Sequence, residues 1–319
     1  MHVVDKGEGL IASAQEMAPT PKEGGDKKRL STGITQLDLL IGGGFLKGKT
    51  YLITGDSGTG KTIFATAFFL KGLMEGEKAV YVSVDDKPSD IVEQAASLGW
   101  DLMKSIADKQ LLMLDAAPFF TGHGGTKKEL DIPKTVADLA SYVSRLGAAR
   151  VVIDPVGPLV PSREGRHIRD NARTLIRSLR EHLETTNLLV LPSAGTGDVE
   201  EWEEYPVAGV IILRLTQTQK GMVRTVLVRK MRATAVELTE HPFKIIGGKG
   251  VVIEPSMPGA APSAPVETIP IPIPIQTPIA AAPVQAVQPQ PELPEEEGNI
   301  FEAWNPIEEM GKKVTKKGA

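Results

Sequence analysis

One glycine-rich stretch of eight residues restricts the fold of this 319-residue chain more than any other feature. It follows an apolar run at residues 51–54 and precedes a pattern of helical length that begins near Thr62. Its sequence is Gly55-Asp56-Ser57-Gly58-Thr59-Gly60-Lys61-Thr62, with the spacing G-x-x-x-x-G-K-T. Between a strand and a helix, this spacing is typical of a P-loop, whose backbone N–H groups bind phosphate oxygens. The sequence therefore predicts an α/β fold that binds a nucleoside triphosphate at residues 55–62.

Lys61 and Thr62 have separate roles in such a site. Lys61 is expected to reach the β- and γ-phosphates, and the Thr62 hydroxyl is expected to ligate Mg²⁺. A second magnesium contact requires a carboxylate at the end of a hydrophobic strand, and Asp115 and Asp154 both follow apolar runs. Chain order favours Asp154, because its strand is expected to lie directly beside the P-loop strand. A structural role in the turn after its strand is the alternative for Asp154.

Apolar runs alternate with helical patterns over much of the chain. The predicted strands are residues 51–54, 79–84, 111–114, 150–153 and 188–191, and the predicted helices are residues 62–75, 89–98, 133–146 and 169–185. This alternation predicts βαβ units around a parallel sheet. An aromatic share of 5% beside 41% hydrophobic residues agrees with the aliphatic core of such a sheet. Four further runs, separated only by turns, predict antiparallel β-hairpins at one edge: residues 207–216, 222–230, 243–246 and 251–253.

Composition divides the chain into one globular domain and two tails. Residues 1–28 lack apolar periodicity and predict a flexible tail, whereas residues 29–254 predict a single domain. Residues 255–294 hold 12 of the 24 prolines and predict an extended linker. Residues 295–319 contain a tethered apolar segment at 300–311, with a possible helix start at Asn305 and Pro306. This segment predicts a docking peptide for a partner protein. A disordered tail and a segment that folds back on its own domain are the alternatives.

Charge and cysteine usage exclude several functional classes. Of the 36 basic and 40 acidic residues, four and eight lie in residues 255–319, so the first 254 residues hold 32 of each. A neutral domain argues against binding to nucleic acid. The absence of cysteine excludes disulfides, zinc–thiolate sites and thiol catalysis. Every apolar stretch of membrane-spanning length is interrupted by charges or prolines, so a soluble, cytoplasmic protein without a membrane segment is expected.

The chain resembles the KaiC family of RecA-like ATPases in several stretches that occur in the family's order. They are residues 29–38, the turn at 42–48, the P-loop, residues 76–83, 97–101 and 207–213, and Lys230-Met231-Arg232. The resemblance covers residues 29–254 and implies a RecA-like P-loop NTPase fold, with a mostly parallel central sheet, flanking helices and C-terminal antiparallel hairpins. It also implies a homo-oligomer, such as a hexamer-type ring, in which ATP and Mg²⁺ lie between subunits. In that arrangement Asp154 takes the magnesium role.

The resemblance further implies that Lys230 and Arg232 face the γ-phosphate on the next subunit. Alternate residues of a strand point the same way, so Met231 is expected to point into the domain. Basic groups in that position stabilise the charge that develops on the transferred phosphoryl group. Ordinary solvated charges on an edge strand are the alternative.

Asp85 and Asp86 depart from the family, which usually has two glutamates after the second strand. A carboxylate at this position is expected to orient or deprotonate the attacking water, and aspartate is shorter by one methylene. A shift of ~1 Å in a catalytic group can lower the rate on the order of 100-fold. Hydrolysis is therefore expected to be slow or absent. Capping of the helix near Pro88 is the alternative role for Asp86.

Three functions fit these features to different degrees. The leading hypothesis is a slow KaiC-like ATPase whose nucleotide state controls oligomerisation and partner recruitment in a regulatory, signalling role. The first alternative is a nucleotide-gated scaffold that does not hydrolyse ATP, as Asp85-Asp86 suggests. The second is a recombination-mediator-like DNA-binding ATPase, which rests on fold analogy alone. The acidic run Glu200-Glu201-Trp202-Glu203-Glu204 argues against the second alternative, because it stands where RecA-like recombinases present loops to DNA.

Overall fold

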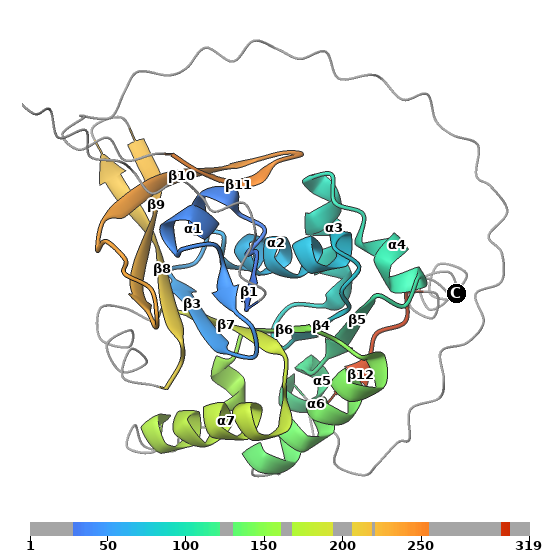
Figure 1. The fold of residues 1–319 in the computed structure, drawn as a ribbon. Helices are drawn as coiled ribbons and strands as arrows, with labels where there is room; N and C mark the ends of the chain where they lie inside the picture. Colours follow the sequence, from blue (N-terminus) through green and yellow to red (C-terminus); the bar gives the residue numbers. More distant parts are fainter. Residues whose placement is uncertain are drawn as a thin grey trace, which may run out of the picture.

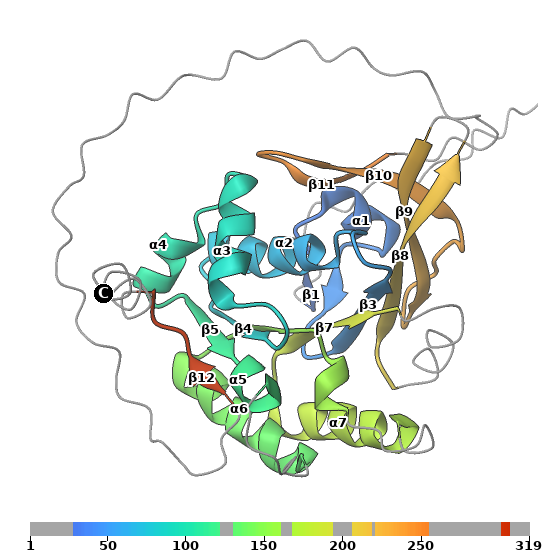
Figure 2. The same cartoon turned by 180° about the vertical axis from the view of Figure 1, so that it is seen from behind.

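A ten-stranded sheet runs through the protein, with helices on both of its faces (Figure 1, Figure 2). The structure, a computed structural model, describes residues 28–121, 130–160, 168–193, 206–218, 221–254 and 301–306. The strand order is β11-β10-β9-β8-β3-β7-β6-β4-β5-β12. The predictions for residues 1–27, for the acidic run at 200–204 and for the linker at 255–294 lie outside the described residues.

The centre of the sheet is parallel, as the alternating pattern predicted. Its strands are β3 (Thr50–Gly55), β4 (Ala79–Ser83), β5 (Leu111–Asp115), β6 (Arg150–Asp154), β7 (Thr186–Pro192) and β8 (Gly209–Thr218). Every residue of β3 and β4 is buried, because helices cover both faces of the sheet. The predicted α/β fold class is therefore confirmed.

The helices divide between the two faces of the sheet. One face carries α1 (Thr35–Leu40), α2 (Lys61–Met74), α3 (Pro88–Ser97) and α4 (Leu102–Ala107), and the other carries α6 (Ile132–Leu146) and α7 (Ile168–His182). Two short elements complete the set: α5 (Ala117–Thr121) and the 3₁₀ helix η1 (Gly157–Leu159). Each helix in the described ranges is too short or too polar to cross a lipid bilayer.

Antiparallel strands extend the sheet beyond β8. They are β9 (Gly221–Met231), β10 (Glu240–Ile246) and β11 (Gly250–Ile253), which follow one another as the predicted hairpins. A separate two-stranded sheet joins β1 (Arg29–Leu30) to β2 (Phe45–Leu46).

One expectation about strand order is wrong. The strand that carries Asp154 does not lie beside the P-loop strand, because β7 pairs with β3 on one side and with β6 on the other. Six of the seven residues of β7 are buried, so this strand takes a central place and β6 lies one position further out. The chain order of strands does not encode such an insertion.

A buried arginine holds the N-terminal segment against the sheet. Arg150, at the start of β6, is fully buried, and its Nε donates to Glu77 Oε2 at 2.7 Å. Its Nη1 donates to the carbonyl oxygens of Ser31 and Phe68, each at 2.7 Å. The charge is thus paired and hydrogen-bonded, as burial of a guanidinium requires.

The C-terminal segment returns to the sheet. Strand β12 (Glu302–Ala303) pairs antiparallel with the end of β5, and the Trp304 N–H donates to the carbonyl oxygen of Met113 at 2.9 Å. Phe301 is 3% exposed, and its carbonyl oxygen accepts a hydrogen bond from the Tyr142 hydroxyl at 3.2 Å. Residues 301–306 of the predicted docking segment therefore fold back on their own domain, and the rest of that segment lies outside the described residues.

Candidate nucleotide-binding site

The glycine-rich loop has the conformation that the sequence motif predicts. It leaves β3 at Gly55 and enters α2 at Lys61. Gly55 has a φ of 152°, and a Cβ atom there would lie 2.1 Å from the carbonyl oxygen of Leu213 on β8. Gly60 has a φ of 101°, and its Cβ atom would lie 2.8 Å from a methyl group of Ile245 on β10. Both positions require glycine, because their φ angles are positive and, at Gly55, the backbone of β8 also approaches closely.

Lys61 folds across this loop. Its Nζ donates to the carbonyl oxygens of Gly55 and Asp56, each at 2.8 Å. Burial lowers the pKa of Lys61, and the carboxylates of Asp154 and Asp56 oppose that shift in part. The ammonium group is therefore held at the loop, within reach of phosphates that the loop would bind.

Thr62 and Asp154 meet at the start of α2. The Thr62 hydroxyl donates to Asp154 Oδ2 at 2.8 Å, and the Tyr81 hydroxyl donates to the same oxygen at 2.8 Å. Burial raises the pKa of the Asp154 carboxyl, the two hydrogen bonds oppose the shift, and the negative charge of Asp86 adds to it. Sequence analysis missed Tyr81, although a tyrosine in an aliphatic strand is a signal, because a buried hydroxyl needs a partner.

The donor atoms at this point fit Mg²⁺. A hydroxyl oxygen and a carboxylate oxygen are hard ligands, and Mg²⁺ is usually bound by one or two carboxylates together with substrate phosphates. Among the described residues, no group of three or more His, Cys, Asp or Glu side chains could form a metal site made of protein alone. Thr62 and Asp154 are therefore the residues that could hold a magnesium ion brought with a nucleotide.

Asp115, the other candidate for the magnesium contact, lies elsewhere. It ends β5, and β4 separates that strand from β6. Its Oδ1 accepts the backbone N–H of Ala117 at 2.9 Å, so it supports the turn into α5.

Asp85 and Asp86 follow β4 at the carboxyl ends of the parallel strands, where the P-loop also lies. The preceding residue, Val84, donates its N–H to the carbonyl oxygen of Asp154 at 3.0 Å. Both aspartates are exposed. Partial burial raises the pKa of Asp85, and the charge of Asp86 adds to this effect. The structure thus brings Asp85, Asp86 and Asp154 together at the carboxyl ends of β4 and β6.

Lys230 and Arg232 lie at the opposite end of β3 from the P-loop, near the amino ends of the parallel strands. Met231, between them, is buried and pairs with Gly209, which in turn pairs with Tyr51 near the start of β3. The six residues of β3 span roughly 17 Å, which is longer than an arginine side chain. Neither basic residue can therefore reach a nucleotide in the P-loop of its own chain.

Arg224 is a further residue that sequence analysis missed. It lies on β9, and its Nε donates to the carbonyl oxygen of Gly58 in the loop at 3.2 Å. The contact joins residues 166 positions apart, so no local pattern could reveal it.

Together, the loop, the lysine and the hydroxyl beside a buried carboxylate define a P-loop nucleotide-binding domain of the RecA type. The family model of the KaiC ATPase matches residues 30–257. The chain belongs to the KaiC ATPase family.

Known relatives agree with this assignment. The chain is 29% identical over 231 residues to the circadian clock protein KaiC3 of Synechocystis, a match that covers 72% of this chain and 46% of that protein. It is 32% identical over 243 residues to a UPF0273 protein of Thermotoga maritima, with coverage of 72% and 97%. A crystal structure of a KaiC-like protein from Pyrococcus horikoshii superposes with a TM-score of 0.61 at 33% identity, and covers 71% of this chain and 99% of that one. The chain thus spans less than half of KaiC3.

Proposed function

We propose that the chain is a slow ATPase that binds MgATP at residues 55–62, and that the bound nucleotide controls association of copies and recruitment of a partner in a regulatory role. The observation that carries the proposal is the 2.8 Å contact between the Thr62 hydroxyl and the Asp154 carboxylate. It joins a hydroxyl of α2 to a carboxylate of β6, which is the pair that holds magnesium in P-loop NTPases.

Nucleotide binding would exchange the contacts of Lys61. The ammonium group leaves two loop carbonyl oxygens and donates to the β- and γ-phosphates, while the loop N–H groups hold the phosphate oxygens. Mg²⁺, when bound, neutralises the charge on these phosphates. Thr62 and Asp154 would hold it, and Tyr81 fixes the orientation of the Asp154 carboxylate.

Asp85 and Asp86 are proposed to orient the attacking water. They stand at the same edge as Asp154, but both are exposed and each is one methylene shorter than glutamate. Looser positioning of the water supports slow hydrolysis. The same observation supports a second candidate function, a nucleotide-gated scaffold that binds MgATP without hydrolysing it.

A second copy would complete the site. Lys230 and Arg232 lie at the far end of β3 from the P-loop, so they are proposed to act on the γ-phosphate of a nucleotide held by a neighbouring copy. This supports a homo-oligomer of ring type. The C-terminal segment at 300–311 is the proposed docking element for a protein partner, which would have to displace residues 301–306 from their pairing with β5.

The test is phosphate release from MgATP as a function of protein concentration. Lys61→Ala removes the phosphate contact, and Lys71→Ala is the matched control. Lys71 lies on the same helix and pairs with Glu75 at the surface, so its loss changes little.

Release per chain that rises with concentration, persists in K71A and vanishes in K61A would support a working ATPase shared between copies. MgATP binding without release above the K61A level would support the scaffold. Equal binding of MgATP by wild type and K61A would overturn both.

A further inference from the structure

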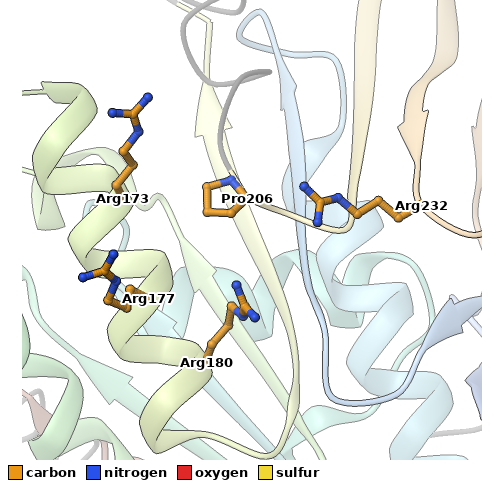
Figure 3. A pocket seen from close by; sticks show the side chains of 5 residues that line it. All are labelled: Arg173, Arg177, Arg180, Pro206 and Arg232. Atoms are coloured by element: carbon orange, nitrogen blue, oxygen red, sulfur yellow. The ribbon is translucent and has the colours of Figure 1, made fainter.

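Four arginines line a hollow beside α7. Arg173, Arg177 and Arg180 line one side, Arg232 lines the other, and Pro206 lies between them (Figure 3). The hollow has a volume of about 360 Å³. We call this set of five residues the arginine cleft. Figure 3 shows the guanidinium groups of Arg180 and Arg232 extending toward the space beside Pro206, whereas those of Arg173 and Arg177 point away from Arg232.

The three arginines of α7 form one stripe. Their spacing of four and three residues puts them on the same face of the helix, away from the buried stripe that includes Leu175 and Leu179. Like charges at this spacing repel one another. A solvated helix face would explain the stripe alone, but it would not explain why the end of β9 brings Arg232 to the same hollow.

The described residues place little negative charge beside the arginine cleft. Within the parts of the chain that the structure describes, the acidic partner recorded for these arginines is Asp170, which lies 3.8 Å from Arg173 at the surface. Arg177, Arg180 and Arg232 are exposed. A guanidinium group offers donors in a planar fork that matches two phosphate oxygens. The cleft therefore suits an anion with several phosphate oxygens.

That anion cannot come from the P-loop of the same chain. Arg232 follows Met231 at the amino end of the sheet, and its N–H donates to the carbonyl oxygen of Ala208 at 2.7 Å. The P-loop leaves the other end of β3. The phosphates must be free in solution or carried by a second chain.

We propose that the arginine cleft is a binding site for the polyphosphate chain of a nucleotide, and that Arg177 and Arg180 bind it together with Arg232. This inference rests on the proposed function, in which Lys230 and Arg232 contact the nucleotide of a second copy. The inference adds the arginines of α7 to those contacts. It goes beyond that function by adding the outer face of α7 to the site.

The main experiment mixes two variants. R177A/R180A keeps its P-loop but lacks the cleft, and K61A keeps the cleft but lacks the P-loop lysine. Both arginines are exposed and alanine favours helix, so the fold is retained. The MgATP affinity of a fixed amount of R177A/R180A is measured while K61A is added. R145A/K249A, which removes two exposed charges away from the cleft, is the matched control for R177A/R180A.

If a second copy carries the phosphates, R177A/R180A should bind MgATP at least tenfold more weakly than wild type and R145A/K249A do. Added K61A should restore the affinity, and added K61A/R177A/R180A should not. A purely structural role for the arginines would not produce rescue by a chain that itself lacks a working P-loop.

Free polyphosphate as the source is tested on K61A alone with inorganic tripolyphosphate. Binding at one site per chain that is lost in K61A/R177A/R180A would establish the cleft with this source. Absence of both rescue and tripolyphosphate binding overturns the inference. If wild type then still binds MgATP, the proposed function stands without it, whereas loss of MgATP binding in wild type defeats the proposed function itself.

Discussion

Two surfaces of different kinds lie at the two ends of β3, the P-loop and the arginine cleft. At the carboxyl end, the loop is shaped by close backbone contacts, and Asp154 already has two hydrogen-bond partners from its own chain. At the amino end, the arginine cleft is exposed, and among the described residues Asp170 is its recorded acidic partner. The first surface is preorganised, and the second depends on what a ligand or another copy brings.

Thr62→Val should give the largest effect, at the carboxyl end. Loss of the hydroxyl removes a magnesium ligand and keeps the shape of the side chain. MgATP affinity should fall about 100-fold, or ~2.7 kcal/mol, whereas metal-free ATP should bind almost unchanged. Calorimetry with and without chelator measures both.

Thr66→Val is the matched control for that prediction. Thr66 lies one turn further along α2 and donates to the carbonyl oxygen of Thr62. Equal loss of affinity with and without magnesium in T62V would show that Thr62 has no metal role.

Replacement of Asp85 and Asp86 by glutamate should speed ATP hydrolysis at the carboxyl end of β3. The longer side chains restore reach toward the water, so phosphate release should rise by about 10- to 100-fold. Asp90→Glu, on α3, is the control with the same chemical change. Unchanged release with normal MgATP binding would show that these aspartates do not limit the reaction.

Arg232→Ala should weaken MgATP binding only at protein concentrations at which copies of the chain associate. At low protein concentration, where copies are apart, its MgATP affinity should equal that of wild type. At high concentration, wild type should bind about tenfold more tightly, because a charged hydrogen bond contributes about 1.5–3 kcal/mol. Titrations at two protein concentrations decide the matter, and an equal deficit at both would place Arg232 outside an interface between copies.

Asp154→Asn should give the smallest effect, on the protein without nucleotide. The folded-state pKa of Asp154 is raised, so its ionised form destabilises the fold at neutral pH. Asparagine removes that charge, and the melting temperature should rise by a few degrees. The charges of Asp86 and Lys61 and the hydrogen bonds from Tyr81 and Thr62 also affect the pKa of this carboxyl. The melting temperatures of D154N and wild type are therefore compared across a range of pH.

The sign of the pH dependence makes that test specific. Below about pH 4, the ordinary pKa of aspartate, the carboxyl is protonated in both the folded and the unfolded chain. The advantage of D154N should therefore be present at pH 7–8 and be lost as the pH falls through the raised pKa of the folded protein toward pH 4. A melting temperature lower than wild type at pH 8 would contradict the prediction.

Local patterns predicted the parts of the molecule that local sequence determines. The parallel strands and the four longest helices appear within a few residues of the expected bounds, because apolar periodicity follows burial. The P-loop was readable because its G-x-x-x-x-G-K-T spacing is itself a local pattern. The short helices α1, α4 and α5 were missed, since five or six residues give too little periodicity.

Contacts between distant segments were not predictable in this way. The place of β7 between β3 and β6 depends on pairing with strands that are distant in the chain, which no local pattern records. The hydrogen bond from Tyr81 to Asp154 depends on the pairing of β4 with β6. The spacing of the α7 arginines was visible in the sequence, but only the register of β9 shows that Arg232 lies opposite them.

The return of the C-terminal segment to β5 bears on solubility. Without β12, the backbone groups of a Leu-Leu-Met-Leu strand would form an open sheet edge, and such edges promote aggregation between chains. A chain cut after residue 254 would expose this edge. Particles formed by such a truncated protein would then arise from edge-to-edge pairing rather than from nucleotide, so assembly has to be measured on a chain that keeps Phe301 and Trp304.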